Sequence, residues 1–406
     1  FCKGDGHILN TDNLQRAIND CGADDILYVP AGDFLTGALR LHSDLEIYLA
    51  KGAVLQGTTN IHDYSPRIPS RFEGTEMRCY SSLLNAGDMN HKTGPNCRNI
   101  IIRGRGTICG GGQELARKII EDERARIKSF LDDNRELVES CENSDTIPGR
   151  VRPRLINLSN CENVWISGIT LKNGPSWNVH MIYCDDIQTD HCTFVSEGVW
   201  NGDGWDPDSS TNCTLFASEF STGDDAVAIK SGKNPEGNEI NRPCAHIRVF
   251  DCRSDCGHGI CIGSEMSGGV EDVQIWDCDL ANSLSGIEIK ATPKRGGYVR
   301  GVTVRDCITP RVMLHSVPYN DDGVPAGAPP KLEHCFFERL TLTAEVLDHD
   351  RSRHDAAPIE IAGFDKPGYE VEDIVFKDIT IPKPSVALPL GLCKGVTLSN
   401  LACVKE

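Results

Sequence analysis

Short stretches in which β-branched residues alternate with polar residues recur along the chain from about residue 97. Alternation with a period of two is typical of a strand that buries one face. Such stretches occur at residues 98–102, 162–166, 245–249, 271–275, 299–304, 372–376 and 394–398. With Val164, Ile187, Leu215, Ile247, Val273 and Val302 as register marks, the steps between units are 23, 28, 32, 26 and 29 residues.

This repeat is typical of a β-solenoid, in which each unit forms one coil and stacks on the next. A leucine-rich repeat would show a Leu/Asn consensus, which this chain lacks. A parallel β-helix requires only apolar residues at stacked inward positions and allows loops of different length between coils. We therefore predict an all-β, single-domain parallel β-helix.

Residues 1–60 differ from the repeats and predict an N-terminal entry or capping segment, followed by the β-helix body at residues 61–406. Thr11, Asp12 and Asn13 precede apolar residues at helical spacing, which indicates the start of a short amphipathic helix. The alternating residues 26–29 and 45–49 predict strands.

A highly charged stretch at residues 114–140 interrupts the repeat, and its apolar residues have near-helical spacing. We interpret it as a helical insertion that projects from the solenoid. It either packs on the coils or on a partner subunit, which would make the protein a homo-oligomer, or it forms a wall that closes one end of a groove.

The composition narrows the partners. A net charge of −18 argues against nucleic acid and anionic membranes as partners, and no apolar run approaches the ~18 residues needed to span a bilayer. The 19 cysteines include no CxxC pair, so zinc spacing is absent. Four of them follow a register mark by five residues, which predicts a ladder of buried free thiols: Cys192, Cys252, Cys278 and Cys307. Unbridged thiols favour a reducing compartment, and we expect a bacterial cytoplasmic protein rather than a secreted one.

Candidate chemistry gathers in three clusters about one coil apart: Asn201-Gly202-Asp203, Gly223-Asp224-Asp225 and Gly257-His258-Gly259. Several carboxylates at close quarters should raise the pKa of at least one of them. A protonated carboxyl beside an ionised one is what glycoside hydrolysis requires, and His258 is placed to tune the acid. Asp and Asn also cap turns in any β-helix, so each cluster alone has a plain structural interpretation.

Together with Ile289-Lys290, the three clusters resemble, in order, the four motifs of the polygalacturonases, the pectin hydrolases of glycoside hydrolase family 28. The resemblance implies a right-handed parallel β-helix, no metal or other cofactor, a pectic oligosaccharide as substrate, and inverting hydrolysis by single displacement. It also implies that Asp224 is the general acid and that Asp203 and Asp225 hold and activate the water. By position, His258 lies beside these residues and Lys290 binds a substrate carboxylate.

The chain departs from the family at Glu288, where the last motif usually has arginine. Glu288 and Lys290 should share one face of their strand, so the change reverses the charge beside the lysine. A neutral sugar such as rhamnose would fit this site better, unless nearby basic residues such as Arg295 compensate or Arg295 forms an ion pair with Glu288.

Four further residues are candidate substrate contacts, and two of them have a structural alternative. Trp177 and His180 precede the first motif by about one coil, and Trp177 either stacks on a sugar or belongs to the core. Lys230 follows the Asp pair and either meets an acidic substrate or is a solvated strand residue. Asn201 belongs to the first motif.

We therefore expect an exo-acting hydrolase of α-galacturonosidic bonds in homogalacturonan oligosaccharides. The nearest alternative is the same chemistry on rhamnogalacturonan oligosaccharides. A pectate lyase that uses calcium and a non-catalytic carbohydrate-binding β-solenoid are more distant alternatives.

Overall fold

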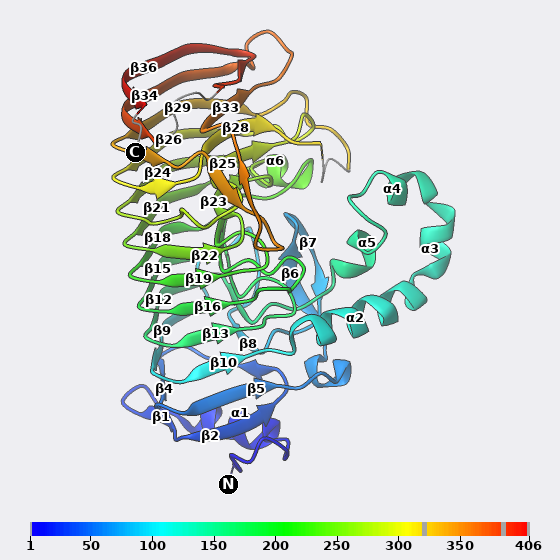
Figure 1. The fold of residues 1–406 in the computed structure, drawn as a ribbon. Coiled ribbons are helices and arrows are strands. Elements are labelled where there is room, and N and C mark those ends of the chain that lie inside the picture. Colours follow the sequence, from blue (N-terminus) through cyan, green and yellow to red (C-terminus); the bar gives the residue numbers. More distant parts are fainter. Residues whose placement is uncertain (1, 319–322, 383–386, 404–406) are drawn as a thin grey trace. The chain divides into compact units, whose positions relative to one another are not determined.

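The computed structural model describes residues 2–318, 323–382 and 387–403. Its internal contacts divide the chain into an N-terminal unit, Phe1–Phe72 with Glu76–Thr214, and a C-terminal unit, Glu73–Thr75 with Leu215–Glu406. Each unit is a stack of parallel β-coils (Figure 1), as the repeat predicts. The predicted boundary at residue 60 is not marked by these contacts and stays a prediction.

The N-terminal unit begins with the predicted helix α1 and then winds three parallel sheets. The helix starts at Thr11, so the polar triplet forms its first turn rather than its cap. The strand orders are β1-β4-β9-β12-β15, β2-β5-β10-β13-β16 and β3-β8-β11-β14-β17. The elements are α1 (Thr11–Asp20), β1 (Ile26–Val29), β2 (Gly32–Thr36), β3 (Leu39–Arg40), β4 (Leu45–Leu49), β5 (Ala53–Gly57), the 3-10 helix η1 (Ile61–Tyr64), β6 (Ile68–Phe72), β7 (Thr75–Cys79), β8 (Leu84–Ala86), β9 (Cys97–Gly104), β10 (Thr107–Cys109), β11 (Ile156–Ser159), β12 (Cys161–Ser167), β13 (Thr170–Lys172), β14 (Val179–Ile182), β15 (Asp185–Asp190), β16 (Thr193–Val195) and β17 (Trp205–Asp208).

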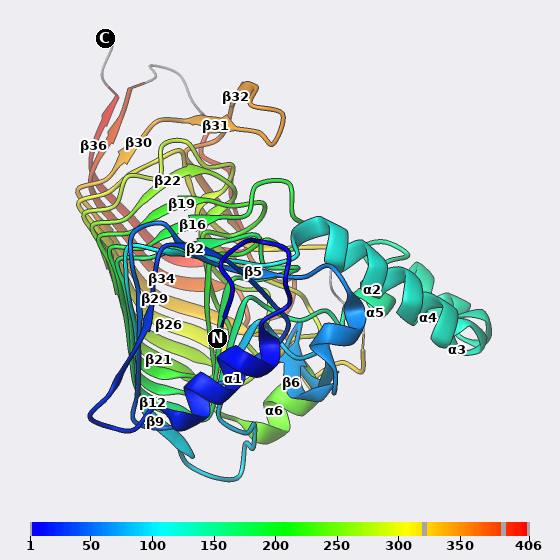
Figure 2. The same cartoon turned by 90° about the horizontal axis from the view of Figure 1, so that it is seen from below.

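The C-terminal unit continues the same plan with sheets ordered β21-β24-β26-β29-β34, β20-β23-β25-β28-β33-β35 and β19-β22. Strand β18 (Thr211–Phe216) contains the boundary between the units. One antiparallel hairpin, β31–β32, departs from the parallel plan (Figure 2). The remaining elements are β19 (Glu219–Ser221), β20 (Val227–Ile229), α6 (Glu236–Ile240), β21 (Cys244–Phe250), β22 (Arg253–Cys256), β23 (Gly259–Gly263), β24 (Val270–Trp276), β25 (Gly286–Ala291), β26 (Tyr298–Arg305), β27 (Ile308–Thr309), β28 (Val312–Ser316), β29 (Lys331–Glu338), β30 (Thr341–Leu342), β31 (Glu345–Leu347), β32 (Arg353–Asp355), β33 (Ile359–Ala362), β34 (Val371–Ile381), β35 (Leu390–Gly391) and β36 (Cys393–Cys403).

The predicted register is confirmed inside each unit. Val164 lies opposite Ile187 in the N-terminal unit, and Ile247, Val273 and Val302 lie opposite one another in the C-terminal unit. All five side chains are at most 1% exposed, so each coil buries its apolar residue on the next, at roughly 25 cal/mol per Å² of apolar surface.

The predicted thiol ladder is also confirmed. The four cysteines are buried and free, and in the C-terminal unit the amide of Cys278 lies 3.5 Å from the sulfur of Cys307.

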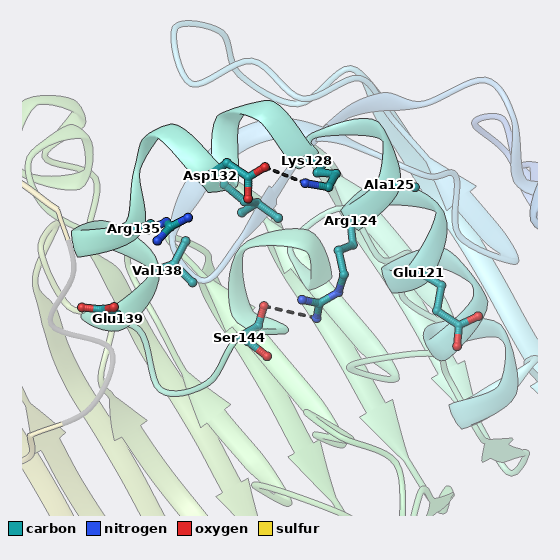
Figure 3. Close-up of a pocket in the computed structure, with 10 residues that line it drawn as sticks. Glu121, Arg124, Ala125, Lys128, Asp132, Arg135, Val138, Glu139 and Ser144 are labelled. Carbon is teal, nitrogen blue, oxygen red and sulfur yellow. Dashed lines mark hydrogen bonds and ion pairs between the residues drawn. The ribbon is translucent and has the colours of Figure 1, made fainter.

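The predicted helical insertion is present in the N-terminal unit and is longer than expected (Figure 1). It comprises α2 (Gly112–Arg126), α3 (Lys128–Asp133), α4 (Arg135–Glu139) and α5 (Thr146–Gly149). Helix α2 buries one apolar face, whereas α3 and α4 bury no side chain. The helices surround a hollow of about 530 Å³ that is lined by residues such as Ala125, Leu131 and Val138, and Figure 3 shows the ion pair of Lys128 with Asp132 at its edge. Whether this insertion binds a second copy or limits a groove stays a prediction.

Among the described residues, no helix combines the length and the apolar character that crossing a membrane would need.

Candidate active site

The Asp224-Asp225 pair lies in the turn before β20 in the C-terminal unit. The hydroxyl of Thr222 donates to the carbonyl of Asp224 at 2.9 Å, and the amide of Asp225 donates to the Asp224 carboxylate at 3.0 Å. The side chain of Asp225 is 2% exposed, whereas that of Asp224 is 23% exposed. The turn thus holds one carboxylate inside the protein and leaves the other accessible to a ligand.

His258 lies one coil later and contacts both carboxylates. Its amide donates to the carbonyl of Asp224 at 2.9 Å. Its Nδ1 lies 2.9 Å from Oδ1 of Asp224 and 3.1 Å from Oδ1 of Asp225. The second and third predicted motifs are therefore brought together as expected from their spacing.

The glycines on either side of His258 are required by the backbone. Gly257 and Gly259 have φ angles of 90° and 102°, which side chains rarely allow. A Cβ atom at Gly257 would lie 2.3 Å from the hydroxyl of Thr222, and one at Gly259 would lie 2.3 Å from the carbonyl of Gly286. The close approach of neighbouring coils thus explains the Gly-His-Gly sequence.

Lys290 and Glu288 lie two residues apart on β25, and each side chain contacts a charged or titratable group of another coil. The ammonium of Lys290 donates to both carboxylate oxygens of Asp225 at 3.1 Å. Glu288 accepts a hydrogen bond from Nε2 of His315 at 2.7 Å, and Nδ1 of His315 lies 3.8 Å from Glu360. Glu288 and Lys290 are 5% and 6% exposed, so both serve contacts within the protein in this structure.

The electrostatics of the site set two protonation states. Burial acts to raise the pKa of Asp225, but the charges of Lys290 and His258 outweigh it and hold this pKa well below its usual range. Burial acts to lower the pKa of His258, but Asp224 and Asp225 raise it to about 10. At Asp225 the shift is therefore opposite to the rise expected from crowded carboxylates, because two cations lie beside it. At neutral pH the site holds an ionised Asp225 and an imidazolium at His258.

This arrangement suits acid–base chemistry. An ionised, anchored carboxylate can hold and activate a water molecule, and an accessible carboxyl can protonate a leaving oxygen. The imidazolium of His258 is a source of a proton 2.9 Å from Asp224.

Among the residues that the structure describes, two groups are compact enough to hold a metal ion: Asp224 with Asp225 and His258, and the more exposed group of Asp348, Asp350 and His354. The first group does not fit calcium, which prefers six to eight oxygen ligands. Its histidine is protonated, and the ammonium of Lys290 already binds Asp225. The donors of this group therefore do not fit a calcium ion.

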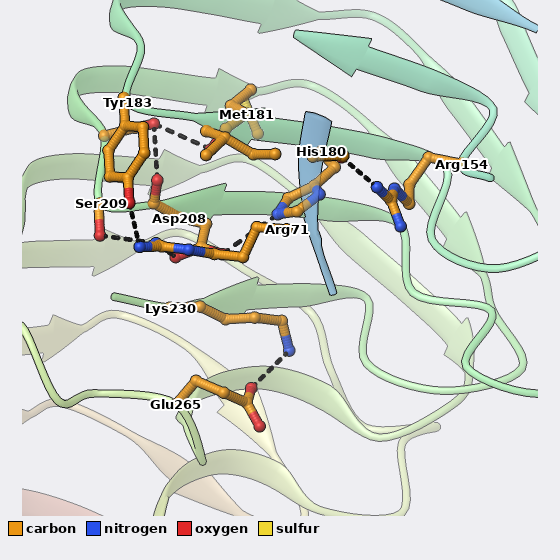
Figure 4. Close-up of polar contacts among 12 residues, drawn as sticks. Arg71, Arg154, His180, Met181, Tyr183, Asp208, Ser209, Lys230 and Glu265 are labelled. Atoms are coloured by element: carbon orange, nitrogen blue, oxygen red, sulfur yellow. Dashed lines mark hydrogen bonds and ion pairs between the residues drawn. The ribbon is translucent and has the colours of Figure 1, made fainter. Parts of the chain in front are cut away.

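Lys230 and Arg295, two predicted substrate contacts, are buried in the C-terminal unit. Lys230 is 5% exposed and lies 3.5 Å from Glu265 (Figure 4), whose pKa is lowered because the charges of Lys230 and Arg295 outweigh its burial. Arg295 donates to the carbonyl of Ser264 and to the side chain of Asn234, both at 2.7 Å. In the described structure Glu288 thus forms its ion pair with His315. The ion pair of Glu288 with Arg295, one alternative from the sequence, is not formed there. A direct substrate role for Lys230 or Arg295 stays a prediction.

The first motif belongs to the N-terminal unit. Asn201 accepts a hydrogen bond from the guanidinium of Arg152 at 2.5 Å, and Arg152 stacks over the ring of Trp200 at 4.1 Å. Asp203 is 2% exposed, and its carbonyl accepts two hydrogen bonds from Asn178. The expected approach of Asp203 to the Asp pair stays a prediction, because those residues lie in the other unit.

Trp177 and His180 belong to the interior of the N-terminal unit. Trp177 is 2% exposed and stacks on Phe72 at 4.8 Å, with the ring of His180 edge-on at 4.7 Å. His180 is fully buried and lies 3.3 Å from Asp208. These contacts favour the core interpretation of Trp177 over stacking on a sugar.

His180 lies beside a buried ion pair between Arg71 and Asp208. Figure 4 shows the guanidinium of Arg71, from β6, beside Asp208 and Ser209, with Nη1 2.7 Å from Asp208. Burial lowers the pKa of His180 to about 4. Burial acts to raise the pKa of Asp208, but the charge of Arg71 outweighs it and brings this pKa to about 2. The histidine is therefore neutral and the pair is complete without it.

Sequence analysis missed three residues beside the candidate site: His315, Glu265 and His349. His315 was detectable, because it lies opposite Lys290 in the next coil. Glu265 and His349 come from loops, and the ring of His349 lies 5.3 Å from that of His258.

Comparison with known proteins agrees with these motifs. A "Probable polygalacturonase" of Vitis vinifera is 34% identical over 74% of this chain, and the match covers 58% of that protein, so this chain spans less than two thirds of its length. An "Exo-poly-alpha-D-galacturonosidase" of Dickeya chrysanthemi is 27% identical, covering 98% of this chain and 70% of that protein. The crystal structure of a hyperthermoactive exopolygalacturonase from Thermotoga maritima superposes with a TM-score of 0.76 at 25% identity, covering 98% of this chain and 90% of that one.

Such neighbours are right-handed parallel β-helices, and this chain has that fold. The sequence pattern of the glycosyl hydrolases family 28 matches residues 21–317, which include all four motifs. The chain belongs to glycosyl hydrolases family 28.

Proposed function

We propose that this protein hydrolyses α-galacturonosidic bonds of pectic oligosaccharides at a chain end, by inverting single displacement. The observation that carries the proposal is the set of contacts in the C-terminal unit, where Asp224, Asp225, His258 and Lys290 meet in the order of the family motifs. The exo-acting relatives of Dickeya and Thermotoga support action at a chain end.

In this proposal Asp224 protonates the leaving oxygen, since its carboxyl is the accessible one of the pair. Asp225, kept ionised by Lys290, holds the attacking water, and the family motifs imply the same role for Asp203. The proton that Asp224 gives up comes from the imidazolium of His258, 2.9 Å away. The proton that the attacking water loses passes to Asp225 and from there to His258, 3.1 Å away, which restores the starting state. By the family motif Lys290 also binds a substrate carboxylate, beside its contact with Asp225.

A product time course from trigalacturonic acid tests the proposal, with Asp224→Asn as the matched inactive variant. We expect early release of galacturonic acid and dimer by the native protein and none by the variant. With longer oligomers, release of a single short product from the start indicates exo action, whereas a spread of lengths indicates endo action. A product that absorbs near 235 nm, or loss of activity with a chelator, would contradict hydrolysis and favour a lyase. Binding without turnover by the native protein would favour a carbohydrate-binding solenoid.

Glu288 supports a second candidate, hydrolysis of rhamnogalacturonan oligosaccharides. Burial acts to raise the pKa of Glu288, but the charges of Lys290 and His315 bring it to about 2, so it is an anion at neutral pH. An anion where the family motif usually has arginine disfavours a galacturonate carboxylate and favours a neutral sugar nearby. Turnover of a rhamnogalacturonan oligosaccharide but not of trigalacturonic acid would select this candidate.

We also propose a reducing compartment for the protein, supported by its 19 free cysteines. Mass spectrometry of alkylated protein from its native host would contradict this if most cysteines were bridged.

A further inference from the structure

The C-terminal unit carries a hairpin that lies outside the residues matched by the family pattern. Strands β31 and β32 pair antiparallel, with Val346 opposite His354, and the family match ends at residue 317. The two strands lie side by side in Figure 2. The hairpin therefore lies in the part of the chain that follows the catalytic motifs.

Three hydrogen bonds attach the hairpin to loops that carry the candidate site. The guanidinium of Arg351 donates to the carbonyl of Asp255 at 3.2 Å, just before the Gly-His-Gly motif. Arg353 donates to Asn282 at 2.7 Å, and the amide of Leu347 donates to the carbonyl of Ser283 at 3.3 Å.

The loop that receives the last two bonds is itself tied to His258. The amide of Leu284 donates to the carbonyl of Gly257 at 2.8 Å, and the amide of Ser285 donates to the carbonyl of His258 at 2.9 Å. The hairpin is thus fixed to both segments that frame His258.

The tip of the hairpin places an imidazole beside the site. The ring of His349 lies 5.3 Å from the ring of His258 at an angle of 60°, and His349 is exposed. Its amide donates to Asp348 at 2.6 Å. Within residues 2–318, 323–382 and 387–403, neither ring nitrogen of His349 has a hydrogen-bond partner.

We propose that the β31–β32 hairpin forms one wall of the substrate site and that the ring of His349 hydrogen-bonds the sugar unit bound beside His258. The proposal rests on the proposed function, since the ligand is a galacturonate-containing oligosaccharide. An imidazole ring has two nitrogens that can form hydrogen bonds, which suits contact with pyranose hydroxyls. His349 is a substrate contact that acts on binding, whereas His258 acts on the Asp pair.

Binding in an inactive background tests the wall directly. The probe is trigalacturonic acid, titrated calorimetrically into Asp224→Asn and into the double variant Asp224→Asn with His349→Ala. We expect the double variant to bind about tenfold more weakly, the effect of losing one hydrogen bond. His349→Gln retains a donor and an acceptor and should recover part of the affinity. The control is His334→Ala in the same background, because His334 is an exposed histidine of β29 that pairs with Asp373.

The kinetic expectation is equally specific. With Asp224 intact, His349→Ala should raise KM about tenfold for trigalacturonic acid and leave kcat within about twofold. Thermal unfolding should be unchanged, since the ring is exposed.

Equal affinity of the single and double variants would overturn the proposal. A fall in kcat with unchanged affinity would also overturn it, because His349 would then act only through His258. If the native protein binds trigalacturonic acid but does not cleave it, the proposed function fails while the affinity comparison still decides the role of His349. If neither the native protein nor Asp224→Asn binds trigalacturonic acid, both fail.

Discussion

Asp208 of the N-terminal unit and Asp225 of the C-terminal unit are both buried carboxylates, and each contacts a cation and a histidine. The pKa values of the two histidines nevertheless shift in opposite directions. Asp208 is bound by Arg71, and the pKa of its neighbour His180 falls to about 4 because burial dominates. Asp225 is bound by Lys290, and the pKa of its neighbour His258 rises to about 10 although burial opposes the rise.

The difference lies in the number of carboxylates. In the first cluster the guanidinium groups of Arg71 and Arg154 already outnumber the carboxylate of Asp208, so a proton on His180 would add an unbalanced buried charge. In the second cluster Asp224 provides another carboxylate that Lys290 does not contact in the described structure, and His258 takes up a proton to balance it. Asp224 is also the partly exposed member. An accessible carboxyl and a stored proton distinguish the candidate active site from a structural ion pair.

The largest expected effect is on turnover by Asp224→Asn. Removing the general acid should lower kcat by about 10²–10⁴-fold, measured as galacturonic acid released from trigalacturonic acid. The midpoint of thermal unfolding should also fall, because Asp224 is the largest of the charges that raise the pKa of His258. A variant that retains kcat within about tenfold would contradict the assignment of the acid.

Asp208→Asn should instead reduce stability. It leaves the fully buried guanidinium of Arg71 without its anion, which costs about 3–5 kcal/mol in the free energy of unfolding. The measurement is urea unfolding at neutral pH. Arg40→Gln, which breaks the exposed pair of Arg40 with Asp88, is the matched control and should cost less than about 1 kcal/mol. Equal midpoints for the two variants would show that the buried cluster is not an ion pair in solution.

His258 and His180 should change the free energy of unfolding in different pH ranges. The folded pKa of His258, about 10, lies above its ordinary value, so its contribution is fully present below about pH 6.5 and is lost as pH rises toward 10. The folded pKa of His180, about 4, lies below its ordinary value, so its effect appears as stability lost when pH falls from about 6.5 toward 4.

Each effect is on the order of 3 kcal/mol. Unfolding free energies of the native protein, His258→Gln and His180→Gln from pH 4 to pH 10 check this. The first variant should flatten only the alkaline side of the profile and the second only the acidic side. Loss of both slopes in either variant would contradict the separation.

The sequence predicted residues that belong to the repeating coils and missed residues that lie in loops. The coils were predictable because every coil must bury an apolar residue at the same place, as Val164 and Ile187 do. The Asp pair and His258 were predictable because they lie at equivalent places in adjacent coils. Residues that reach a cluster through a loop carry no period: His349 follows His258 by 91 residues.

The sequence also did not show which side chains are covered by segments that lie far away along the chain. Whether Trp177 faces a sugar or the core depends on Phe72, which covers it and comes from β6, 105 residues earlier in the chain. The charge of Lys290 is aimed at Asp225 for a similar reason, since the pairing of coils, and not the Ile-Lys motif itself, brings them together.

The smallest expected effect concerns substrate preference at Glu288. Glu288→Gln preserves the shape and an acceptor for His315 but removes a buried negative charge beside Lys290. Trigalacturonic acid should then bind better, with KM lower by about three- to tenfold, roughly 1 kcal/mol, because less negative charge opposes the substrate carboxylate. Glu360→Gln is the matched control, since it removes a charge 3.8 Å beyond His315 without touching Lys290 in the described contacts, and its KM should change less than twofold. A KM that rises in Glu288→Gln would mean that the anion serves mainly to hold Lys290 against Asp225, and would extend the catalytic cluster of the C-terminal unit by one further carboxylate.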